Sequence, residues 1–366
     1  MTPRSTQFVR IFAGAFLLLF FLTSRGEQDD MRTTPLKPDE TLVFIATAAS
    51  LDERSDTWRV PLHAWAYEPE ESVIRKRVIA EALDRKYGLK VTDATRDNFT
   101  RRVNLFLGDN ERGKSIVIRI AGTAIELPPT QPNGHVYHML TLDGDAVAQH
   151  RTGRVLRFTA VLPEFDRRVF EGHVTLIEPA GLSIVSDIDD TVKITHVIDH
   201  GKMFDATFFQ DFQPAPGMAE LYRGWVDNGA VVHFVSSSPW QLHGPLVEFF
   251  DTAGFPFATV SLKHVRFKDS TFFDLFKSGE ETKPRQIEPL LQAYPRRRFV
   301  LVGDSGEQDP ETYADLYRRH PSQIERIYIR NVTGARSDDA RFARVFRDIS
   351  PTRWRLFDDP TGLSMP

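Results

Sequence analysis

The chain has 366 residues, a formal net charge of −4 and no cysteine. This length accommodates about two domains, and an apolar content of 41 % is enough for buried cores. The absence of cysteine excludes disulfides, cysteine metal ligands, a cysteine nucleophile and a lipid-modified cysteine. The small net charge gives no reason to expect a nucleic-acid partner.

Residues 1–30 have the pattern of a targeting segment. Two arginines precede an apolar run over residues 11–22, and three carboxylates follow it. This order is typical of a secretory signal, although the run is shorter than the roughly 20 residues of a membrane span. We expect a cleaved signal peptide or an uncleaved anchor, and therefore an exported or membrane-anchored protein. Translation from Met31 would instead make the protein cytoplasmic. Residues 31–40 then form a polar linker.

Residues 41–179 predict a mostly-β domain. Short apolar and β-branched runs alternate with turn residues, which is typical of a sandwich-like or barrel-like domain. The candidate strands are residues 41–46, 59–65, 115–120, 136–140, 156–162 and 170–177.

One amphipathic helix interrupts these strands over residues 72–87. Its expected apolar face carries Ile74, Val78, Leu83 and Tyr87, and Gly88 ends it. Five basic side chains form another face. They predict either an ordinary solvated surface or contact with anionic lipid headgroups.

The most informative segment follows a predicted buried strand at residues 182–186. Asp187, Asp189, Asp190 and Thr191 come where that strand ends. Since residues two apart in a strand point to the same side, Asp187 and Asp189 can face one bound phosphate. One carboxylate can attack phosphorus, and the other can protonate the leaving alcohol and later activate water. The alternative is an acidic surface turn.

Three later segments place suitable partners at further strand or helix ends. Ser236 and Ser237 follow a strand at residues 231–235, and hydroxyl and amide groups there can hold phosphate oxygens. Lys283 opens an amphipathic helix and can neutralise negative charge. Asp304 and Asp309 follow a strand at residues 299–302, and acidic oxygens suit Mg²⁺.

The second half of the chain, residues 180–366, alternates strands and helices as a parallel sheet requires. We expect an α/β catalytic domain with a three-layer, doubly wound parallel sheet. The carboxyl ends of such strands are where ligands bind. The segments described above therefore converge on one edge of the sheet.

Four motifs carry a resemblance to a known family. They are SDIDDTVK at residues 186–193, PGM at 216–218, VSSSPWQL at 235–242 and LVGDSGEQD at 301–309. They resemble the haloacid dehalogenase (HAD) superfamily, and more closely the phosphatidate phosphatase domain of actin-patch-associated proteins and their bacterial relatives. The resemblance covers residues 181–332 and implies a HAD-like fold.

The resemblance also implies a role for each matching residue. Asp187 is then the nucleophile and a magnesium ligand. Asp189 is the general acid and base, binds the metal through its carbonyl and is oriented by Thr191. Ser236 would hold the phosphoryl group, with Ser237 as the alternative for that role. Lys283 would neutralise charge, with Lys263 as the competing candidate. Asp304 and Asp309 would complete the metal site.

Two phenylalanine-rich insertions are candidates for substrate selection. Residues 196–213 and residues 264–277 each carry four phenylalanines, the second with basic neighbours. These rings predict either contact with a greasy anionic substrate or an ordinary apolar core. Lys193 is a further candidate for contact with a headgroup.

Taken together, these features predict a Mg²⁺-dependent phosphatase that acts on phosphatidic acid at a membrane surface through an aspartyl-phosphate. One alternative is a HAD phosphatase for another lipid or a soluble phosphomonoester. The other is a catalytically degenerate module that binds lipid or protein. No motif of the usual kinds indicates nucleic-acid binding.

Overall fold

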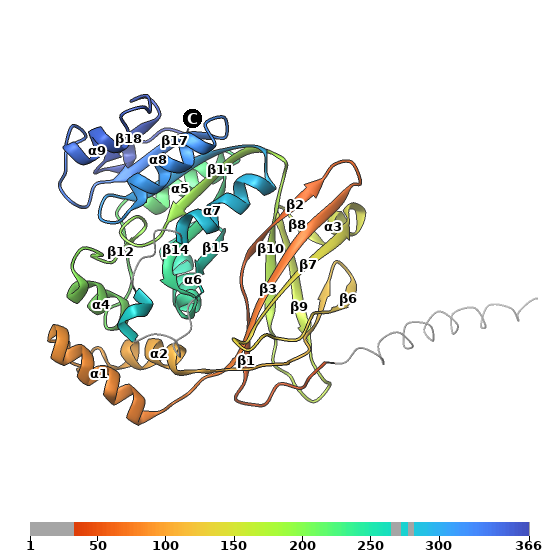
Figure 1. The fold of residues 1–366 in the computed structure, drawn as a ribbon. Helices are drawn as coiled ribbons and strands as arrows, with labels where there is room; N and C mark the ends of the chain where they lie inside the picture. The colour runs from red at the N-terminus through yellow and green to blue at the C-terminus, as the bar shows by residue number, and fades with distance from the viewer. Residues whose placement is uncertain (1–32, 265–271, 277–281, 366) are drawn as a thin grey trace, which may run out of the picture.

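The computed structural model describes residues 33–264, 272–276 and 282–365, and its strands gather in two large sheets (Figure 1). One sheet is built from residues 41–177 and the other from residues 180–357. The predicted targeting segment, residues 1–30, lies outside the described ranges. Within those ranges, every helix is too short or too polar to cross a bilayer.

The first sheet comprises ten of the described strands in the path order β1-β3-β2-β10-β9-β5-β6, with β4, β7 and β8 at its branches. Its pairs are antiparallel except for β2 with β10. The strands are β1 (Thr41–Phe44), β2 (Thr47–Asp52), β3 (Thr57–Glu68), β4 (Asp109–Asn110), β5 (Val117–Ile120), β6 (Thr123–Glu126), β7 (His135–Asp143), β8 (Arg151–Thr152), β9 (Val155–Val161) and β10 (Glu171–Ile177).

Alternating side chains give this sheet its core, because Val60, Leu62 and Ala64 of β3 are buried in one apolar cluster. The small helix α3 (Gly144–His150) adds Val147 to the same cluster. The predicted mostly-β region is thus one hydrogen-bonded sheet, and its sandwich-like layering stays a prediction.

Helix α1 (Val73–Tyr87) lies where the sequence predicts it, but its buried face is different. Ser72 caps its first turn through Arg75 N, and Gly88 ends it at a φ of 71°. Ile79 and Leu83 are buried, whereas Ile74 and Val78 are 78 % and 60 % exposed. The predicted apolar face is therefore wrong for Ile74 and Val78. The helix turns those two side chains to solvent.

Helix α2 (Arg96–Leu107), which the sequence analysis did not identify, joins the two halves of the chain. Its Phe99, Val103 and Phe106 share an apolar cluster with residues of the second sheet. The buried guanidinium of Arg102 donates hydrogen bonds to Thr207 O at 2.8 Å and Gln210 O at 2.6 Å. These contacts hold α2 against the second half, and α1 packs on α2 (Figure 1).

The second sheet is parallel throughout, in the order β15-β14-β11-β16-β17-β18, as predicted for a mixed α/β region. Its strands are β11 (Ala180–Asp187), β14 (Val231–Pro239), β15 (Ala258–Lys263), β16 (Arg296–Asp304), β17 (Ile324–Arg330) and β18 (Trp354–Phe357). The helices that alternate with them are α4 (His200–Phe208), α5 (Met218–Asp227), α6 (His243–Thr252), α7 (Thr282–Ala293), α8 (Asp309–Arg319) and α9 (Ala340–Val345).

Both faces of this sheet are covered by helices, which explains its continuous apolar runs. Ile184 packs in a cluster with Tyr222 of α5 and Leu246 of α6. Its neighbour Val185 packs in another cluster, with Ile287 of α7 and Tyr313 of α8.

The strand register brings the predicted motifs to one edge. Asp187 is level with Val235, one residue before Ser236, and Ser186 is level with Val302, two residues before Asp304. Because β14, β11 and β16 are neighbours, their carboxyl ends meet.

Candidate active site

Three buried carboxylates form the centre of the site. Asp187 ends β11, Asp304 ends β16 and Asp309 begins α8. One ligand oxygen from each lies within 4.8 Å of the others. All three side chains are at most 1 % exposed.

Lys283 supplies the positive charge next to these carboxylates. Its Nζ lies 2.9 Å from Asp187 Oδ1 and 3.4 Å from Glu307 Oε2, and it also contacts Asp309 Oδ1. The residue is 6 % exposed, so these contacts are shielded from water. Glu307 is a member of this network that the sequence analysis did not predict.

Burial controls the charge state of this centre. It raises the pKa of Asp187 well above its usual value, against the opposing effect of Lys283 and with the help of Asp309. Burial, followed by Asp309, likewise raises the pKa of Asp304. For Lys283, the attraction of Asp187 and Asp309 outweighs burial and raises its pKa. The carboxyl groups at this centre outnumber the one lysine that contacts them, so a further cation is needed to hold them all ionised.

The unmet negative charge fits a divalent cation. Asp304 Oδ2 is buried and accepts no hydrogen bond within the described part of the chain. Asp187 Oδ1 meets the ammonium of Lys283 but accepts no well-directed hydrogen bond from described residues. Carboxylate oxygens are the ligands that hard divalent cations prefer, so Asp187, Asp304 and Asp309 can hold one.

Asp189 belongs to a separate network of hydroxyls and one lysine. Its Oδ2 accepts hydrogen bonds from Ser236 Oγ at 2.9 Å and Ser238 Oγ at 2.7 Å. Its Oδ1 meets Thr195 Oγ1 at 2.9 Å and Lys193 Nζ at 2.8 Å. Burial acts to raise the pKa of Asp189, but Lys193 and these donors outweigh it and hold the pKa at about 2. Asp189 is thus ionised.

Thr191 contacts a different carboxylate from the one predicted. Its Oγ1 donates a hydrogen bond to Asp187 Oδ2 at 2.9 Å, whereas the threonine that donates to Asp189 is Thr195. After Asp187 the chain leaves the strand and turns back, as the bond from Val192 N to Ile188 O shows. This turn brings Thr191 beside the first carboxylate.

Asp190 shapes this loop. Its carboxylate accepts hydrogen bonds from the backbone N–H groups of Thr195, His196 and Val197, at 2.7 to 2.9 Å. Its φ is 55°, in the left-handed region that aspartate tolerates better than most side chains. The third aspartate of the motif therefore supports the loop that presents the other two.

The three residues predicted to contact the substrate or to substitute for another site residue, Lys193, Ser237 and Lys263, lie in three different places. Lys193 is 3 % exposed and pairs with Asp189, so it does not offer its ammonium to solvent as a headgroup contact. Ser237 lines a small cleft beside Asp189 and Glu307. Lys263, at the end of β15, lines a different and larger cavity.

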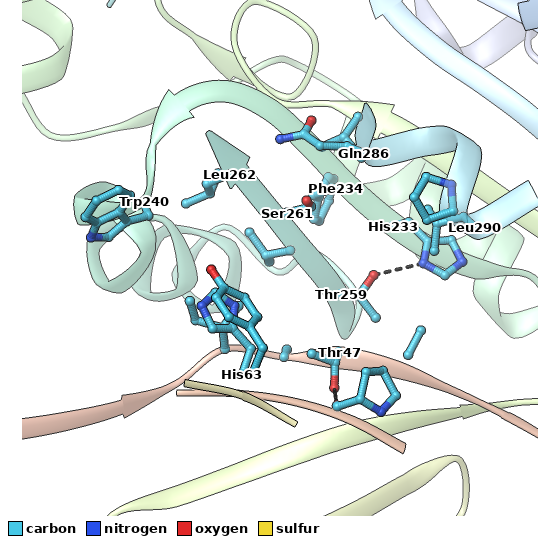
Figure 2. A pocket seen from close by; sticks show the side chains of 18 of the residues that line it. Thr47, His63, His233, Phe234, Trp240, Thr259, Ser261, Leu262, Gln286 and Leu290 are labelled. Atoms are coloured by element: carbon cyan, nitrogen blue, oxygen red, sulfur yellow. Dashed lines mark hydrogen bonds between the residues drawn. The ribbon is translucent and has the colours of Figure 1, made fainter. Parts of the chain in front are cut away.

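That larger cavity lies between the two sheets (Figure 2). Its volume is about 1040 Å³, and most of its wall is apolar, including Ile45, Ala48, Leu62, Val260, Leu262 and Leu290. Gln286, also in the wall, donates to Ser236 O at 3.0 Å. The cavity therefore adjoins the strand end that carries Ser236.

Four of the eight phenylalanines in the insertions are buried core residues. Phe204, Phe208, Phe209 and Phe272 are 8 % exposed or less and pack in one cluster. Phe276 lines the small cleft, and Phe267 lies outside the described residues. The buried rings are therefore unavailable for direct contact with a substrate.

The part of the chain that carries this site is similar to known proteins. Residues 182–331 match the family model described as phosphatidate phosphatase APP1, catalytic domain. Phosphatidate phosphatase APP1 of Saccharomyces cerevisiae is 36 % identical over 166 residues, which are 44 % of this chain and 28 % of the yeast protein. An uncharacterized protein of Schizosaccharomyces pombe is 32 % identical over 168 residues, 45 % of this chain and 27 % of that protein.

The chain spans less than a third of the length of either relative. Among solved structures, phosphoserine phosphatase in its apo form is similar over 40 % of this chain and 85 % of that chain, at 14 % identity and a TM-score of 0.26. We draw nothing from so low a score.

Proposed function

We propose that this chain hydrolyses phosphatidic acid to diacylglycerol and phosphate. The first support is that residues 182–331 match the phosphatidate phosphatase catalytic-domain family. One observation carries the proposal beyond the similarity. The strand-end carboxylate Asp187 is buried, faces Lys283 at 2.9 Å and lies beside two further acidic residues. This arrangement suits a nucleophile held against a cation.

Asp187 attacks phosphorus in this proposal and forms an aspartyl-phosphate, and the bond from phosphorus to the lipid oxygen breaks. Thr191 and Lys283 each contact Asp187, so they keep its carboxylate in place. Mg²⁺, held by Asp187, Asp304 and Asp309, would supply positive charge to the phosphoryl oxygens.

Asp189 protonates the leaving alcohol and then accepts a proton from the attacking water. Its pKa of about 2 suits the second of these tasks in the ligand-free state. An incoming phosphate brings negative charge next to Asp189, which raises the pKa of that carboxyl and favours the first task. Lys193 and Thr195 hold Asp189 throughout.

Ser236 is proposed to hold the phosphoryl oxygens, with Ser237 as the alternative. The Ser236 hydroxyl donates to Asp189 Oδ2 at 2.9 Å. Exchange of this acceptor for a phosphate oxygen would also free Asp189 to receive a proton. Lys283, rather than Lys263, is the neutralising lysine because its ammonium lies among the carboxylates.

Two surfaces support a lipid substrate. The apolar cavity beside Ser236 can take an acyl chain, since each buried methylene contributes roughly 0.8 kcal/mol. Helix α1 presents Val73, Ile74 and Val78 to solvent next to exposed arginines. An apolar patch with basic neighbours is typical of helices that lie on an anionic membrane surface.

The test is phosphate release from phosphatidic acid in mixed micelles by the full chain, with Mg²⁺ or with a chelator. We expect release that requires the metal and disappears in Asp187→Asn, which should stay folded. Turnover of a small soluble ester but not of phosphatidic acid would reassign the substrate. Failure to hydrolyse any phosphate ester would instead indicate a binding module.

A further inference from the structure

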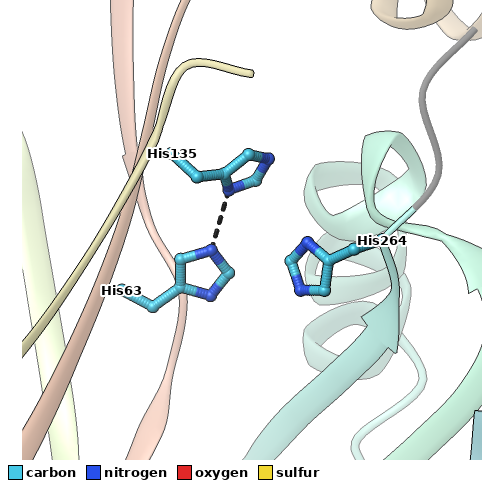
Figure 3. Close-up of side chains that lie close together, drawn as sticks. All are labelled: His63, His135 and His264. Carbon is cyan, nitrogen blue, oxygen red and sulfur yellow. Dashed lines mark hydrogen bonds between the residues drawn. The ribbon is translucent and has the colours of Figure 1, made fainter. Parts of the chain in front are cut away.

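Three histidines meet at the boundary between the two sheets, away from the carboxylates (Figure 3). His63 comes from β3 and His135 from β7, while His264 directly follows β15 of the parallel sheet. One ring nitrogen from each lies within 4.8 Å of the others. In Figure 3 the ring of His264 turns a nitrogen-bearing edge toward the other two.

The pair His63 and His135 is held tightly. His63 Nε2 lies 2.8 Å from His135 Nδ1. Strands β3 and β7 are paired in register, with His63 opposite Tyr137 and Trp65 opposite His135. Tyr137 stacks on His63 with ring centroids 4.2 Å apart. The aromatic neighbours therefore fix the orientation of both imidazoles.

His135 also has a buried ring nitrogen without a partner in the described part of the chain, at the ring atom that His63 does not contact. The residue is fully buried, yet its Nε2 has no hydrogen-bond partner among the described residues. Buried polar atoms without partners are rare because they lose their hydration without compensation.

We propose that His63, His135 and His264 bind one divalent transition-metal ion, with zinc as the expected class. Imidazole nitrogens suit zinc and related ions, whereas magnesium and calcium prefer oxygen. The site is independent of the catalytic carboxylates and of the proposed phosphatase activity.

The rings need only small movements to reach ligand geometry. At Zn–N distances of about 2.0–2.1 Å, tetrahedral ligand nitrogens are roughly 3.3 Å apart. Ligation through His63 Nε2 and His135 Nδ1 therefore requires their present spacing of 2.8 Å to open by about half an ångström. His264 must close in by turning its side chain at the end of β15, where its ring also lies beside Trp240. Tyr137, whose hydroxyl lies 3.1 Å from His264 Nδ1, can keep the ring turned inward.

The metal would join the two halves of the molecule. His63 and His135 belong to the ten-stranded sheet, and His264 continues the edge strand of the parallel sheet. His63 and His264 also line the large cavity, so a fourth coordination position can face that space. An ion bound in the folded state alone stabilises that state by mass action.

The probe is Co²⁺, titrated into the full chain with Mg²⁺ in large excess to occupy the carboxylate site. We expect one equivalent with the intense visible absorption of a tetrahedral ion, and its displacement by Zn²⁺. His264→Ala should weaken Co²⁺ binding at least tenfold and His63→Gln should do the same. The neighbouring His138→Ala is the matched control and should keep the affinity of the unaltered protein.

Asp304→Asn separates this site from the catalytic one. Under the proposal it leaves the tetrahedral Co²⁺ signal intact, whatever its effect on hydrolysis. A signal that is lost in Asp304→Asn but kept in His264→Ala would overturn the proposal. No binding of Co²⁺ or Zn²⁺ below millimolar concentration would also overturn it and leave a hydrogen-bonded histidine pair.

Discussion

Replacing Lys283 by methionine tests the balance of charge at the centre of the site. Methionine keeps much of the side-chain volume but removes the ammonium, which leaves Asp187, Asp309 and Glu307 facing one another without compensation. Removal of one partner from a buried ion pair costs about 3–5 kcal/mol, because the other charge stays buried. We expect the free energy of unfolding to fall by about that amount.

Chemical denaturation in the presence of a chelator measures this loss. A loss of this size raises the unfolded population roughly a hundred- to a few thousand-fold. Added Mg²⁺ should restore part of the stability, since it brings positive charge to the same carboxylates. Asp309→Asn in the Lys283→Met background should also recover part of it, because it removes one of the opposed charges.

The matched control is Lys202→Met. Lys202 lies 3.8 Å from Asp199, and its side chain is 68 % exposed, so water screens this ion pair and its loss should cost little stability. Equal stability of Lys283→Met and Lys202→Met, measured without metal, would refute the reasoning. It would mean that the carboxylates at the centre are already protonated or hydrated.

Three further predictions concern the rest of the molecule. Burial lowers the pKa of His233 to about 3, so the unfolded state binds more protons from about pH 6.5 down to that value, and stability falls as the pH falls. The free energy of unfolding, measured in urea at each pH across this range, should depend on pH less steeply in His233→Gln than in the unaltered protein, by up to about 1.4 kcal/mol per pH unit. An unchanged slope contradicts a buried neutral imidazole. Met139→Trp, at the wall of the large cavity, should raise KM for long-chain phosphatidic acid but not for a soluble ester, and Val247→Trp should change neither. Ile74→Glu with Val78→Glu should weaken sedimentation with anionic vesicles at least tenfold without loss of soluble-ester turnover; undiminished binding would remove α1 from the membrane contact.

Much of the parallel sheet follows from the sequence because its three central strands, β11, β14 and β16, each contain a mostly apolar run. The strands predicted at residues 182–186, 231–235 and 299–302 are all present as β11, β14 and β16. Parallel pairing brings their carboxyl ends together, so the convergence of Asp187, Ser236 and Asp304 on one edge required no structure.

The hydroxyl partners of Asp189 were harder to predict. Thr195 lies beyond a loop whose turns depend on the carboxylate of Asp190, and no strand or helix period places it. The sequence does contain a signal for Ser238, because it lies two residues after Ser236 and side chains two apart on an extended chain point to the same side. The same loop geometry moves Thr191 from Asp189 to Asp187.

The surface of α1 shows a different limit of sequence patterns. Apolar spacing indicates a face but not whether another element covers it. Helix α2 packs against one side of α1, so Ile79 and Leu83 are buried while Ile74 is exposed. The cluster of His63, His135 and His264 is beyond sequence reasoning for a similar reason. Two of its members lie on strands of the first sheet and the third follows a strand of the second, and these sheets meet only in the folded chain.

The identity of the phosphorylated residue tests the proposed mechanism most directly. The unaltered full chain would be mixed with phosphatidic acid labelled in its phosphate, quenched in acid within the first turnover and digested for peptide mapping. The proposed mechanism predicts an alkali-labile phosphate on the peptide that contains Asp187, and no label in Asp187→Asn. Label on any other residue, or hydrolysis with no labelled protein at any time in the first turnover, would contradict it.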